Sequence, residues 1–430
     1  MAARKRHWWA VAAVAAVLAL VVAFALNAST FFPTTTASTG PGGPPPSSTV
    51  PSAAGTAAAS NSVTATSTPT VAPPSPAPSK PAPDRAQQKL ASMTMAQKVG
   101  QLLMVAAPVT GPDPNTLYAL DTLHVGNIFM KGRSAAGQAG IAGVVSAVTS
   151  HVSGARTNGV RPFVSTDQEG GFVQIMSGPG FSTIPQAIVQ GQEPPAQLQA
   201  QAATWGLQLA SAGVNVDLAP VLDTVPSAAF APSNAPIGLY GREYGYSPAA
   251  VSAHGVAFAR GMMAAGVDPA GKHFPGLGRV TANTDTSSGV TDDITVRGDA
   301  YIAPFRDAVN AGIPWLMVSN AFYPKIDPVN LAPFSPVIIS GMMRGDLGFR
   351  GVIVSDDICD AVQVSAVPVA QRAVNFINAG GTMALCTDQA KIAAMYEGTL
   401  SAATTDPAFA AKVNAAALLV LETKSAKGLF

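Results

Sequence analysis

The fold is decided by Gly271-Lys272-His273-Phe274-Pro275-Gly276-Leu277-Gly278, taken together with Gly351-Val352-Ile353-Val354-Ser355-Asp356-Asp357. The first stretch ends an apolar run with a cation and an imidazole before Pro and Gly bend the chain. The second ends an apolar run with two carboxylates. Buried parallel strands are nearly continuous apolar runs, and an α/β barrel builds its active site from polar groups at their carboxyl ends. The two stretches therefore predict such a barrel.

Apolar runs rich in β-branched residues alternate with Ala-rich helical patterns, such as Pro195–Ala212 and Pro248–Ala265, which predicts βα units and a parallel sheet. The eight strand candidates are Val99–Ala106, Val125–Met130, Pro162–Thr166, Val214–Pro220, Val267–Phe274, Pro314–Asn320, Gly351–Ser355 and Gly381–Cys386. The glycines that suit helix C-caps before strands are Gly213, Gly266, Gly312 and Gly380. No Gly-x-Gly-x-x-Gly fingerprint follows the first strand, so we expect a closed (β/α)8 TIM-type barrel rather than an open doubly wound sheet.

Polar side chains gather at the predicted strand ends, although the whole chain has only 24 acidic residues. In strand order they are Asp167 and Glu169, Asp217 and Asp223, Lys272 and His273, Ser319 and Asn320, Asp356 and Asp357, and Cys386 and Asp388. The carboxyl ends of all the strands meet at one face of a barrel. We therefore expect a single polar site at that face rather than scattered surface charge.

The N-terminal part of the chain differs in composition from the rest. A basic flank at residues 4–6 precedes an uncharged run over residues 8–26, close to the roughly 20 apolar residues that a membrane-spanning helix needs. We expect residues 1–27 to be a membrane anchor or a cleaved signal peptide, with the remainder exported and extracytoplasmic. Residues 28–83, rich in Ser, Thr, Pro and Ala, predict a disordered linker, which leaves residues 84–430 as the folded part.

The charge balance bears on the possible partners. A net charge of +1 gives no electrostatic case for nucleic acid. We expect a monomer that touches a membrane only through its N-terminal segment. The two cysteines, Cys359 and Cys386, are too few for a disulfide framework. They are either a bridge between neighbouring strand ends or two ordinary buried thiols.

Ordered motifs extend over the whole folded part. They are Asp167-Gln168-Glu169-Gly170-Gly171, Asn215-Val216-Asp217-Leu218-Ala219-Pro220-Val221-Leu222-Asp223, Ile237-Gly238 with Arg242-Glu243-Tyr244-Gly245, Lys272-His273-Phe274-Pro275-Gly276, and Gly348-Phe349-Arg350-Gly351-Val352-Ile353-Val354-Ser355-Asp356-Asp357. With these motifs, residues 90–425 resemble the N-terminal barrel domain of glycoside hydrolase family 3. The resemblance is to single-domain bacterial β-N-acetylglucosaminidases (β-hexosaminidases) of peptidoglycan turnover.

The resemblance implies that Asp356 is the nucleophile, whose carboxylate attacks the anomeric carbon and forms a covalent glycosyl-enzyme. The alternative is that Asp356 caps the following helix, a role that suits Asp357 better. Lys272 and His273 match residues that hold sugar hydroxyls in the family. Their alternative is structural, as a buried Lys–Asp pair and a core histidine.

Two more residues match sugar-binding positions of the family. Asp167 corresponds to a residue that binds two ring hydroxyls, and Arg242 corresponds to a sugar-binding arginine. Either residue is alternatively a charge that fixes its own loop. We expect no metal and no organic cofactor, because two-carboxylate chemistry needs neither and no ligand cluster is evident in the sequence.

The sequence departs from the family at the acid/base. Asn283-Thr284-Asp285 stands where the glucosaminidases have Asp-Ser-His, and no histidine follows His273. In one interpretation Asp285 is itself the acid/base, since a carboxylic acid is the usual proton donor of retaining glycosidases. The short polar residues 283–288 also suit a mobile catalytic loop. In the other interpretation the site has lost its acid and only binds sugar.

Other departures concern the substrate. Phe172 and Ile175 stand where the family usually has arginine, and Ser319-Asn320 replaces a small residue and a histidine. The folded part has only two tryptophans, so a sugar-stacking platform is not obvious. We expect a retaining hydrolase that releases a terminal β-linked sugar, and the resemblance implies N-acetylglucosamine of cell-wall material as the first candidate. A glycan-binding protein on the same barrel and a glycoside phosphorylase remain as alternatives.

Overall fold

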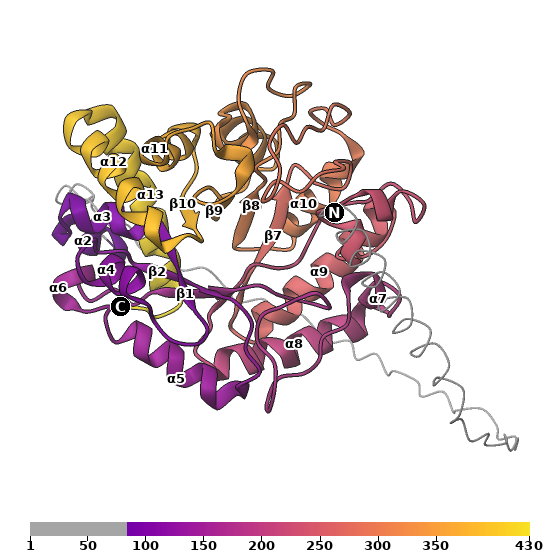
Figure 1. The fold of residues 1–430 in the computed structure, drawn as a ribbon, viewed down its shortest axis with the longest axis horizontal. Coiled ribbons are helices and arrows are strands. Elements are labelled where there is room, and N and C mark those ends of the chain that lie inside the picture. Colours follow the sequence, from indigo (N-terminus) through magenta and orange to yellow (C-terminus); the bar gives the residue numbers. More distant parts are fainter. Residues whose placement is uncertain (1–83) are drawn as a thin grey trace, which may run out of the picture. The chain divides into compact units, whose positions relative to one another are not determined.

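The computed structural model describes residues 84–430 (Figure 1). The anchor or signal predicted at residues 1–27 and the linker predicted at residues 28–83 lie outside the described residues. Within residues 84–430, none of the helices combines the length and the apolar character needed to cross a membrane.

Eight parallel strands close into a barrel, in the spatial order β1-β10-β9-β8-β7-β6-β3-β2. Their bounds are β1 (Leu103–Pro108), β2 (Asn127–Lys131), β3 (Phe163–Thr166), β6 (Val216–Asp217), β7 (Asp268–Phe274), β8 (Trp315–Val318), β9 (Val352–Asp357) and β10 (Met383–Cys386). A separate antiparallel hairpin, β4 (Gln168–Gly170) with β5 (Val173–Gln174), projects after β3. The predicted (β/α)8 barrel is confirmed.

Helices surround the strands, and α8 and α9 run side by side on the outside of the barrel (Figure 1). The α-helices are α2 (Arg85–Ser92), α3 (Met95–Gln101), α4 (Pro114–Asp121), α5 (Gly137–Thr149), α6 (Gly154–Thr157), α7 (Ala187–Gln190), α8 (Pro195–Ser211), α9 (Pro248–Ala264), α10 (Ala303–Asn310), α11 (Val369–Ala379), α12 (Ile392–Thr405) and α13 (Pro407–Ala426). Shorter or irregular helical segments are η1 (Ala231–Ser233), η2 (Gly238–Tyr240), η3 (Ala300–Ile302), η4 (Ala332–Phe334), η5 (Val337–Asp346), η6 (Val362–Val364) and η7 (Gln389–Lys391).

The predicted strand bounds differ from the observed ones by more than two residues at two places. The run Val99–Ala106 begins as helix, because Thr94 and Gln97 form a capping box that starts α3, and β1 begins only at Leu103. The run Val214–Pro220 is a strand only at Val216–Asp217. The Asn215 side chain, rather than a ladder carbonyl, accepts the hydrogen bond of the Val164 N–H at 2.8 Å.

The barrel interior is a packed core at its amino-terminal end. Trp315 is fully buried and meets Phe163 edge to face, with ring centroids 4.8 Å apart. Below them, the buried Lys424 of α13 donates to Gln101 Oε1 at 2.8 Å and to the Gly126 carbonyl at 3.0 Å. Any opening to solvent in the barrel is therefore at the carboxyl-end face.

Candidate active site

One cavity of about 370 Å³ lies at the carboxyl ends of the strands. It is lined by every residue that the sequence predicted for the site: Asp167, Arg242, Lys272, His273, Asp285 and Asp356. Those residues come from five different strand ends and loops, which only the closed barrel brings together.

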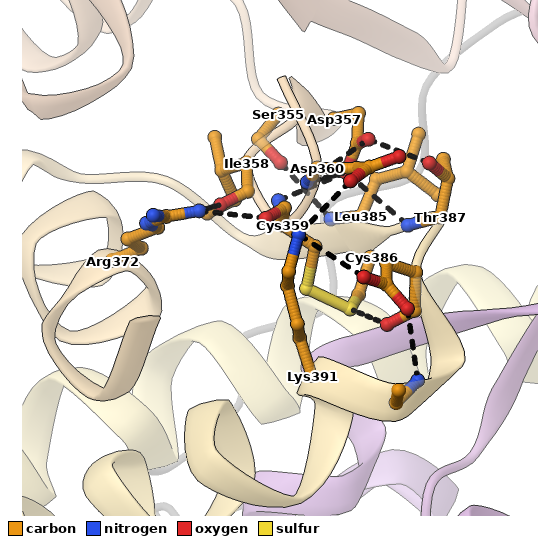
Figure 2. Close-up of a disulfide and its surroundings, with 12 residues drawn as sticks. Ser355, Asp357, Ile358, Cys359, Asp360, Arg372, Leu385, Cys386, Thr387 and Lys391 are labelled. Carbon is orange, nitrogen blue, oxygen red and sulfur yellow. Dashed lines mark hydrogen bonds and ion pairs between the residues drawn. A yellow bond between two sulfur atoms is a disulfide. The ribbon is translucent and has the colours of Figure 1, made fainter. Parts of the chain in front are cut away.

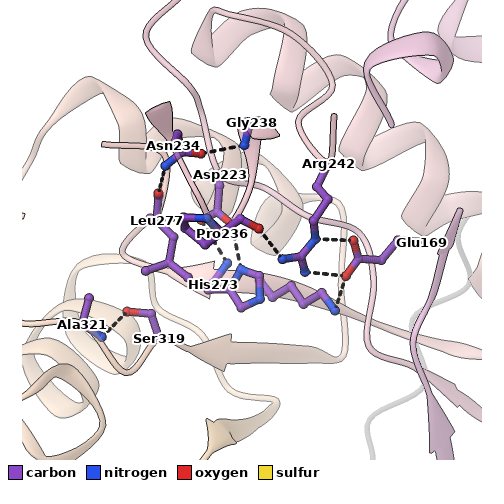
Figure 3. A network of polar contacts seen from close by, with 12 residues as sticks. Glu169, Asp223, Asn234, Pro236, Gly238, Arg242, His273, Leu277, Ser319 and Ala321 are labelled. Carbon is purple, nitrogen blue, oxygen red and sulfur yellow. Dashed lines mark hydrogen bonds and ion pairs between the residues drawn. The ribbon is translucent and has the colours of Figure 1, made fainter. Parts of the chain in front are cut away.

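A buried ion network forms one part of the cavity (Figure 3). Arg242 donates two hydrogen bonds to the Glu169 carboxylate, from Nε to Oε2 at 2.8 Å and from Nη2 to Oε1 at 2.7 Å. Lys272 Nζ lies 2.5 Å from Glu169 Oε1. Burial alone would raise the pKa of Glu169, but Arg242 and Lys272 outweigh it and lower that pKa to about 2. Glu169 is therefore a fixed negative charge that orients two cations.

Asp167 completes this network at its solvent side. Its Oδ1 accepts from Lys272 Nζ at 2.7 Å, and its side chain keeps a quarter of its surface exposed (25%). Burial would lower the pKa of Lys272, yet Asp167 and Glu169 raise it to about 12. The structural Lys–Asp pair is thus present, and both of its members also face the cavity.

His273 is oriented by a buried carboxylate from the neighbouring strand end. Its Nδ1 lies 2.7 Å from Asp223 Oδ2, and its backbone N–H and that of Leu277 donate to Asp223 Oδ1 at 3.2 Å and 2.8 Å. A carboxylate can only accept, so Nδ1 donates to Asp223, and this hydrogen bond fixes the imidazole ring beside the cavity that His273 lines.

The turn after His273 explains the glycines of the opening stretch. Gly276 has φ +136°, which other residues rarely adopt. A Cβ on Gly278 would lie 1.9 Å from the carbonyl oxygen of Thr224. The close approach to residues 223 and 224 keeps His273 and Asp223 in register.

The two carboxylates at the end of β9 have different surroundings. Asp357 is 8% exposed, and its oxygens accept from the Cys359 N–H at 2.9 Å and from Thr387 Oγ1 at 2.6 Å (Figure 2). Asp356 is half-buried and accepts only from the Asp357 N–H, at 2.8 Å. Asp357 therefore holds the loop, while the carboxylate of Asp356 is open to the cavity. The helix cap expected of Asp357 is not formed, because the next helical segment, η6, begins at Val362 with Ala361 as its N-cap.

Asp285 reaches the same cavity from the loop after β7. Its N–H donates to Asn283 Oδ1 at 2.8 Å, and its carbonyl accepts from the Val362 N–H at 3.1 Å. The side chain faces open solvent on one side, although protein atoms crowd the others. This crowding and the nearby charges of Asp356 and Asp357 raise its pKa to about 6. A carboxyl group with that pKa can hold or release a proton near neutral pH.

Comparison with known proteins decides the family. Residues 94–421 match the glycosyl hydrolase family 3 N-terminal domain. This chain belongs to that family. The crystal structure of a β-N-acetylhexosaminidase from Beutenbergia cavernae is similar to it, with 47% identity, a TM-score of 0.77, and coverage of 78% of this chain and 99% of the other.

Curated relatives of the glycosyl hydrolase family 3 chain agree with this assignment. A β-hexosaminidase of Thiobacillus denitrificans is 35% identical over 54% of this chain, and one of Nitrosomonas eutropha is 32% identical over 52%. The aligned parts cover 64% and 65% of those two relatives. The chain thus spans a little under two thirds of the length of the curated relatives that it matches.

A disulfide braces the loop that follows Asp356 and Asp357. Cys359 and Cys386 are bonded, with their Cα atoms 4.8 Å apart (Figure 2). Of the two possibilities left by the sequence, the structure has the bridge. It ties the loop after β9 to the last residue of β10, while Arg372 Nη1 donates to the carbonyls of Ile358 and Cys359 at 3.0 Å and 2.7 Å.

The positions where this chain departs from its family lie in different surroundings. Ile175 lines the cavity, whereas Phe172 is 55% exposed at the tip of the β4–β5 hairpin. Ser319 and Asn320 are buried and do not line the cavity. Ser319 Oγ pairs with the Tyr323 hydroxyl at 2.9 Å, and Asn320 Nδ2 donates to the Asp357 carbonyl at 2.7 Å.

Several functional neighbours were missed at the level of sequence. Glu169 and Asp223 were noted at strand ends but not chosen, although one orients Arg242 and Lys272 and the other orients His273. Buried cations need paired carboxylates, and this requirement could have identified Glu169. Nothing in the sequence indicated that Lys131 lines the cavity, where its Nζ donates to the Thr387 carbonyl at 2.8 Å. Within residues 84–430, no three His, Cys, Asp or Glu side chains cluster as a metal site would require.

Proposed function

We propose that this chain hydrolyses terminal β-linked N-acetylglucosamine with retention of configuration, acting on cell-wall glycans. The observation that carries the proposal is the cavity that Asp285 and Asp356 line together with four candidate sugar-holding residues. The similarity to proteins described as β-hexosaminidases supports the choice of sugar. The predicted export of the chain, which we also propose, would bring it to such glycans.

In the first step, the Asp356 carboxylate attacks the anomeric carbon. The bond from that carbon to the glycosidic oxygen breaks, and the leaving oxygen takes the proton of Asp285. An ester between the sugar and Asp356 results. Asp356 suits the role because only one backbone N–H engages it, so its oxygens remain available.

In the second step, the electrostatics of the cavity favour a change in the role of Asp285. Formation of the ester removes the negative charge of Asp356, which helps to keep the pKa of Asp285 near 6. That pKa then falls, and the ionised Asp285 acts as the base that takes a proton from water. Water attacks the anomeric carbon, the ester bond breaks, and Asp356 regains its charge.

The sugar hydroxyls are held by the ion network and by His273. Asp167 has an accessible carboxylate to accept from them, and Lys272 and Arg242 supply donors beside it. The His273 imidazole, held by Asp223, lines the same cavity. Because Glu169 fixes both cations before substrate arrives, little side-chain entropy is lost on binding.

The test is release of nitrophenol from a panel of nitrophenyl β-glycosides by the full chain, with and without inorganic phosphate. We expect turnover of the β-N-acetylglucosaminide, with free N-acetylglucosamine as product at every phosphate concentration. Stimulation by phosphate with a sugar 1-phosphate as product would instead identify a phosphorylase. Binding of N-acetylglucosamine without turnover of any glycoside would identify a glycan-binding protein.

A further inference from the structure

Three side chains from different loops stack at the carboxyl-end face of the barrel. The rings of Phe172 and Tyr240 are parallel within 17°, with centroids 4.5 Å apart. The guanidinium of Arg133 lies over the Phe172 ring, 4.9 Å from its centroid, and donates to the carbonyls of Phe172 and Gln174. Phe172 nevertheless stays 55% exposed, which is unusual for an aromatic ring with two stacking partners.

This stack adjoins the cavity along each of the three segments. Arg133 lies two residues after Lys131, Phe172 three residues before Ile175, and Tyr240 two residues before Arg242, and those three neighbours all line the cavity. The segments are also tied together, since the Ser134 N–H donates to the Ile175 carbonyl at 2.9 Å. The stack is therefore part of the same rigid rim.

The position of the stack determines which part of a bound glycan can lie against it. The amino-terminal end of the barrel is closed by the buried Lys424, so a glycan whose terminal sugar fills the cavity must leave across the carboxyl-end face. Arg242, two residues after Tyr240, lines the same cavity as Asp285, the proposed proton donor. The glycosidic oxygen that Asp285 protonates is therefore in the cavity that the stack adjoins.

We propose that Arg133, Phe172 and Tyr240 bind the leaving-group sugar of a β-linked glycan, the unit directly beyond the scissile bond. This inference rests on the proposed function and extends it from the terminal sugar to the next one. Arg133 and Tyr240 cover the faces of the Phe172 ring, so the apolar C–H groups of a pyranose would pack against its exposed remainder. The free N–H groups of Arg133 can donate to the sugar hydroxyls. Phe172 replaces the arginine usual in the family, so the stack is a feature of this chain.

Binding measurements separate this rim from the cavity. In the full chain carrying Asp356→Ala, titration calorimetry compares N-acetylglucosamine with its β-1,4-linked disaccharide. We expect Phe172→Ala to weaken binding of the disaccharide about fivefold to tenfold and to leave the monosaccharide within about twofold. Phe172→Trp should keep the preference for the disaccharide. The control Leu207→Ala removes a side chain that is 59% exposed on α8 and should change neither affinity.

Each other outcome overturns a defined part of the account. If Phe172→Ala weakened the binding of both sugars equally, or of neither, the proposed leaving-group site would be wrong. The proposed function would still stand. If the Asp356→Ala chain bound neither sugar, the proposed function would be wrong, and the leaving-group site that rests on it would be wrong as well. In chains with Asp356 intact, the same substitution should lower kcat/KM for the disaccharide and not for N-acetyl-β-glucosaminyl fluoride, whose leaving group reaches no rim.

Discussion

Two groups of charged residues share the cavity, and they are built in opposite ways. The paired group (Asp167, Glu169, Arg242 and Lys272) alternates anion and cation, with N–O distances of 2.5–2.8 Å. The carboxylate group (Asp285, Asp356 and Asp357) has no cation within salt-bridge distance among the described residues.

The difference separates positioning from chemistry. In the paired group every charge is fixed by another, so Glu169 and Lys272 keep their charges across the physiological pH range. In the carboxylate group the charges repel one another, and a proton or a new covalent bond at one residue changes the others. Substitutions in the paired group should therefore weaken substrate binding and lower stability. Substitutions in the carboxylate group should lower the rate of the reaction.

The largest effect is expected at Asp356. Asp356→Ala removes the group proposed to form the covalent intermediate, so kcat should fall at least about 10⁴-fold. Thermal unfolding should change little, because Asp356 contributes only one hydrogen bond to the fold. The matched control is Asp360→Ala, which removes another cavity carboxylate that is paired with Lys391 at 2.9 Å. A variant at Asp356 that kept kcat within tenfold of the parent would assign the nucleophile elsewhere.

Glu169→Gln should disrupt the ion pairs of the paired group and leave the reacting carboxylates in place. It removes the charge shared by Arg242 and Lys272, so Lys272 keeps Asp167 as its ion-pair partner and Arg242 keeps none among the described residues. We expect a loss of about 3–5 kcal/mol in the free energy of unfolding, measured in urea, and a rise in KM that exceeds the fall in kcat. Asp346→Asn, at the exposed pair with Arg297, is the control and should leave both unchanged. Unaltered stability of Glu169→Gln would mean that the network is not structural.

Opening the disulfide should have a smaller effect, on the loop beside the carboxylate group. The bridge closes 27 residues of chain, and by lowering the entropy of the unfolded chain it stabilises the folded state by about 3.5 kcal/mol. The double variant Cys359→Ser/Cys386→Ser should lose about that much stability in calorimetric melting. Reductant should lower the melting temperature of the parent and leave the double variant unaffected. Equal sensitivity of the two to reductant would contradict a bridge in the folded protein.

An effect seen only when the pH is varied is expected from Asp217, a buried carboxyl behind the paired group. Burial raises its pKa from 3.8 to about 8, and its Oδ2 has no hydrogen-bond partner. Between those pH values the folded chain binds a proton that the unfolded chain has released, so this contribution to stability is lost progressively as pH rises. Asp217→Asn cannot ionise and keeps an acceptor for the Gln168 N–H. As pH rises from 4 to about 8, the free energy of unfolding of Asp217→Asn should increase relative to that of the parent. A difference between the two that did not change with pH would mean that Asp217 is ionised when buried.

The sequence could predict the strands and the face of the site, but not which charged side chains pair with one another. Apolar runs ending in polar residues identified the barrel and the face of the site, because that pattern is local and repeats with each βα unit. The six predicted site residues line one cavity because barrel closure brings all strand ends together. Glu169 and Asp223 were not chosen, since which carboxylate meets which cation depends on side-chain geometry between strands. The start of β1 was missed because the capping box at Thr94 outweighed the apolar pattern.

The stack of Arg133, Phe172 and Tyr240 was beyond sequence-based prediction for another reason. Its members are separated in the chain and come from three loops, and no periodic pattern links them. Only tryptophans were considered as stacking platforms, and both tryptophans of the described residues are buried. Loop residues are positioned by the scaffold rather than by their neighbours in sequence.

The central claim, that Asp285 is the proton donor, is tested most directly by a series of aryl and alkyl β-N-acetylglucosaminides with leaving groups of increasing basicity. The account predicts that kcat/KM of Asp285→Ala matches that of the parent within about tenfold for nitrophenol, which hardly needs a proton, and falls about 10²- to 10⁴-fold for alkyl leaving groups. In the parent, kcat/KM for the alkyl substrates should fall as pH rises through about 6, and this fall should be absent from the variant. An equal loss across the whole leaving-group series, with the fall above pH 6 retained, would contradict Asp285 as the acid.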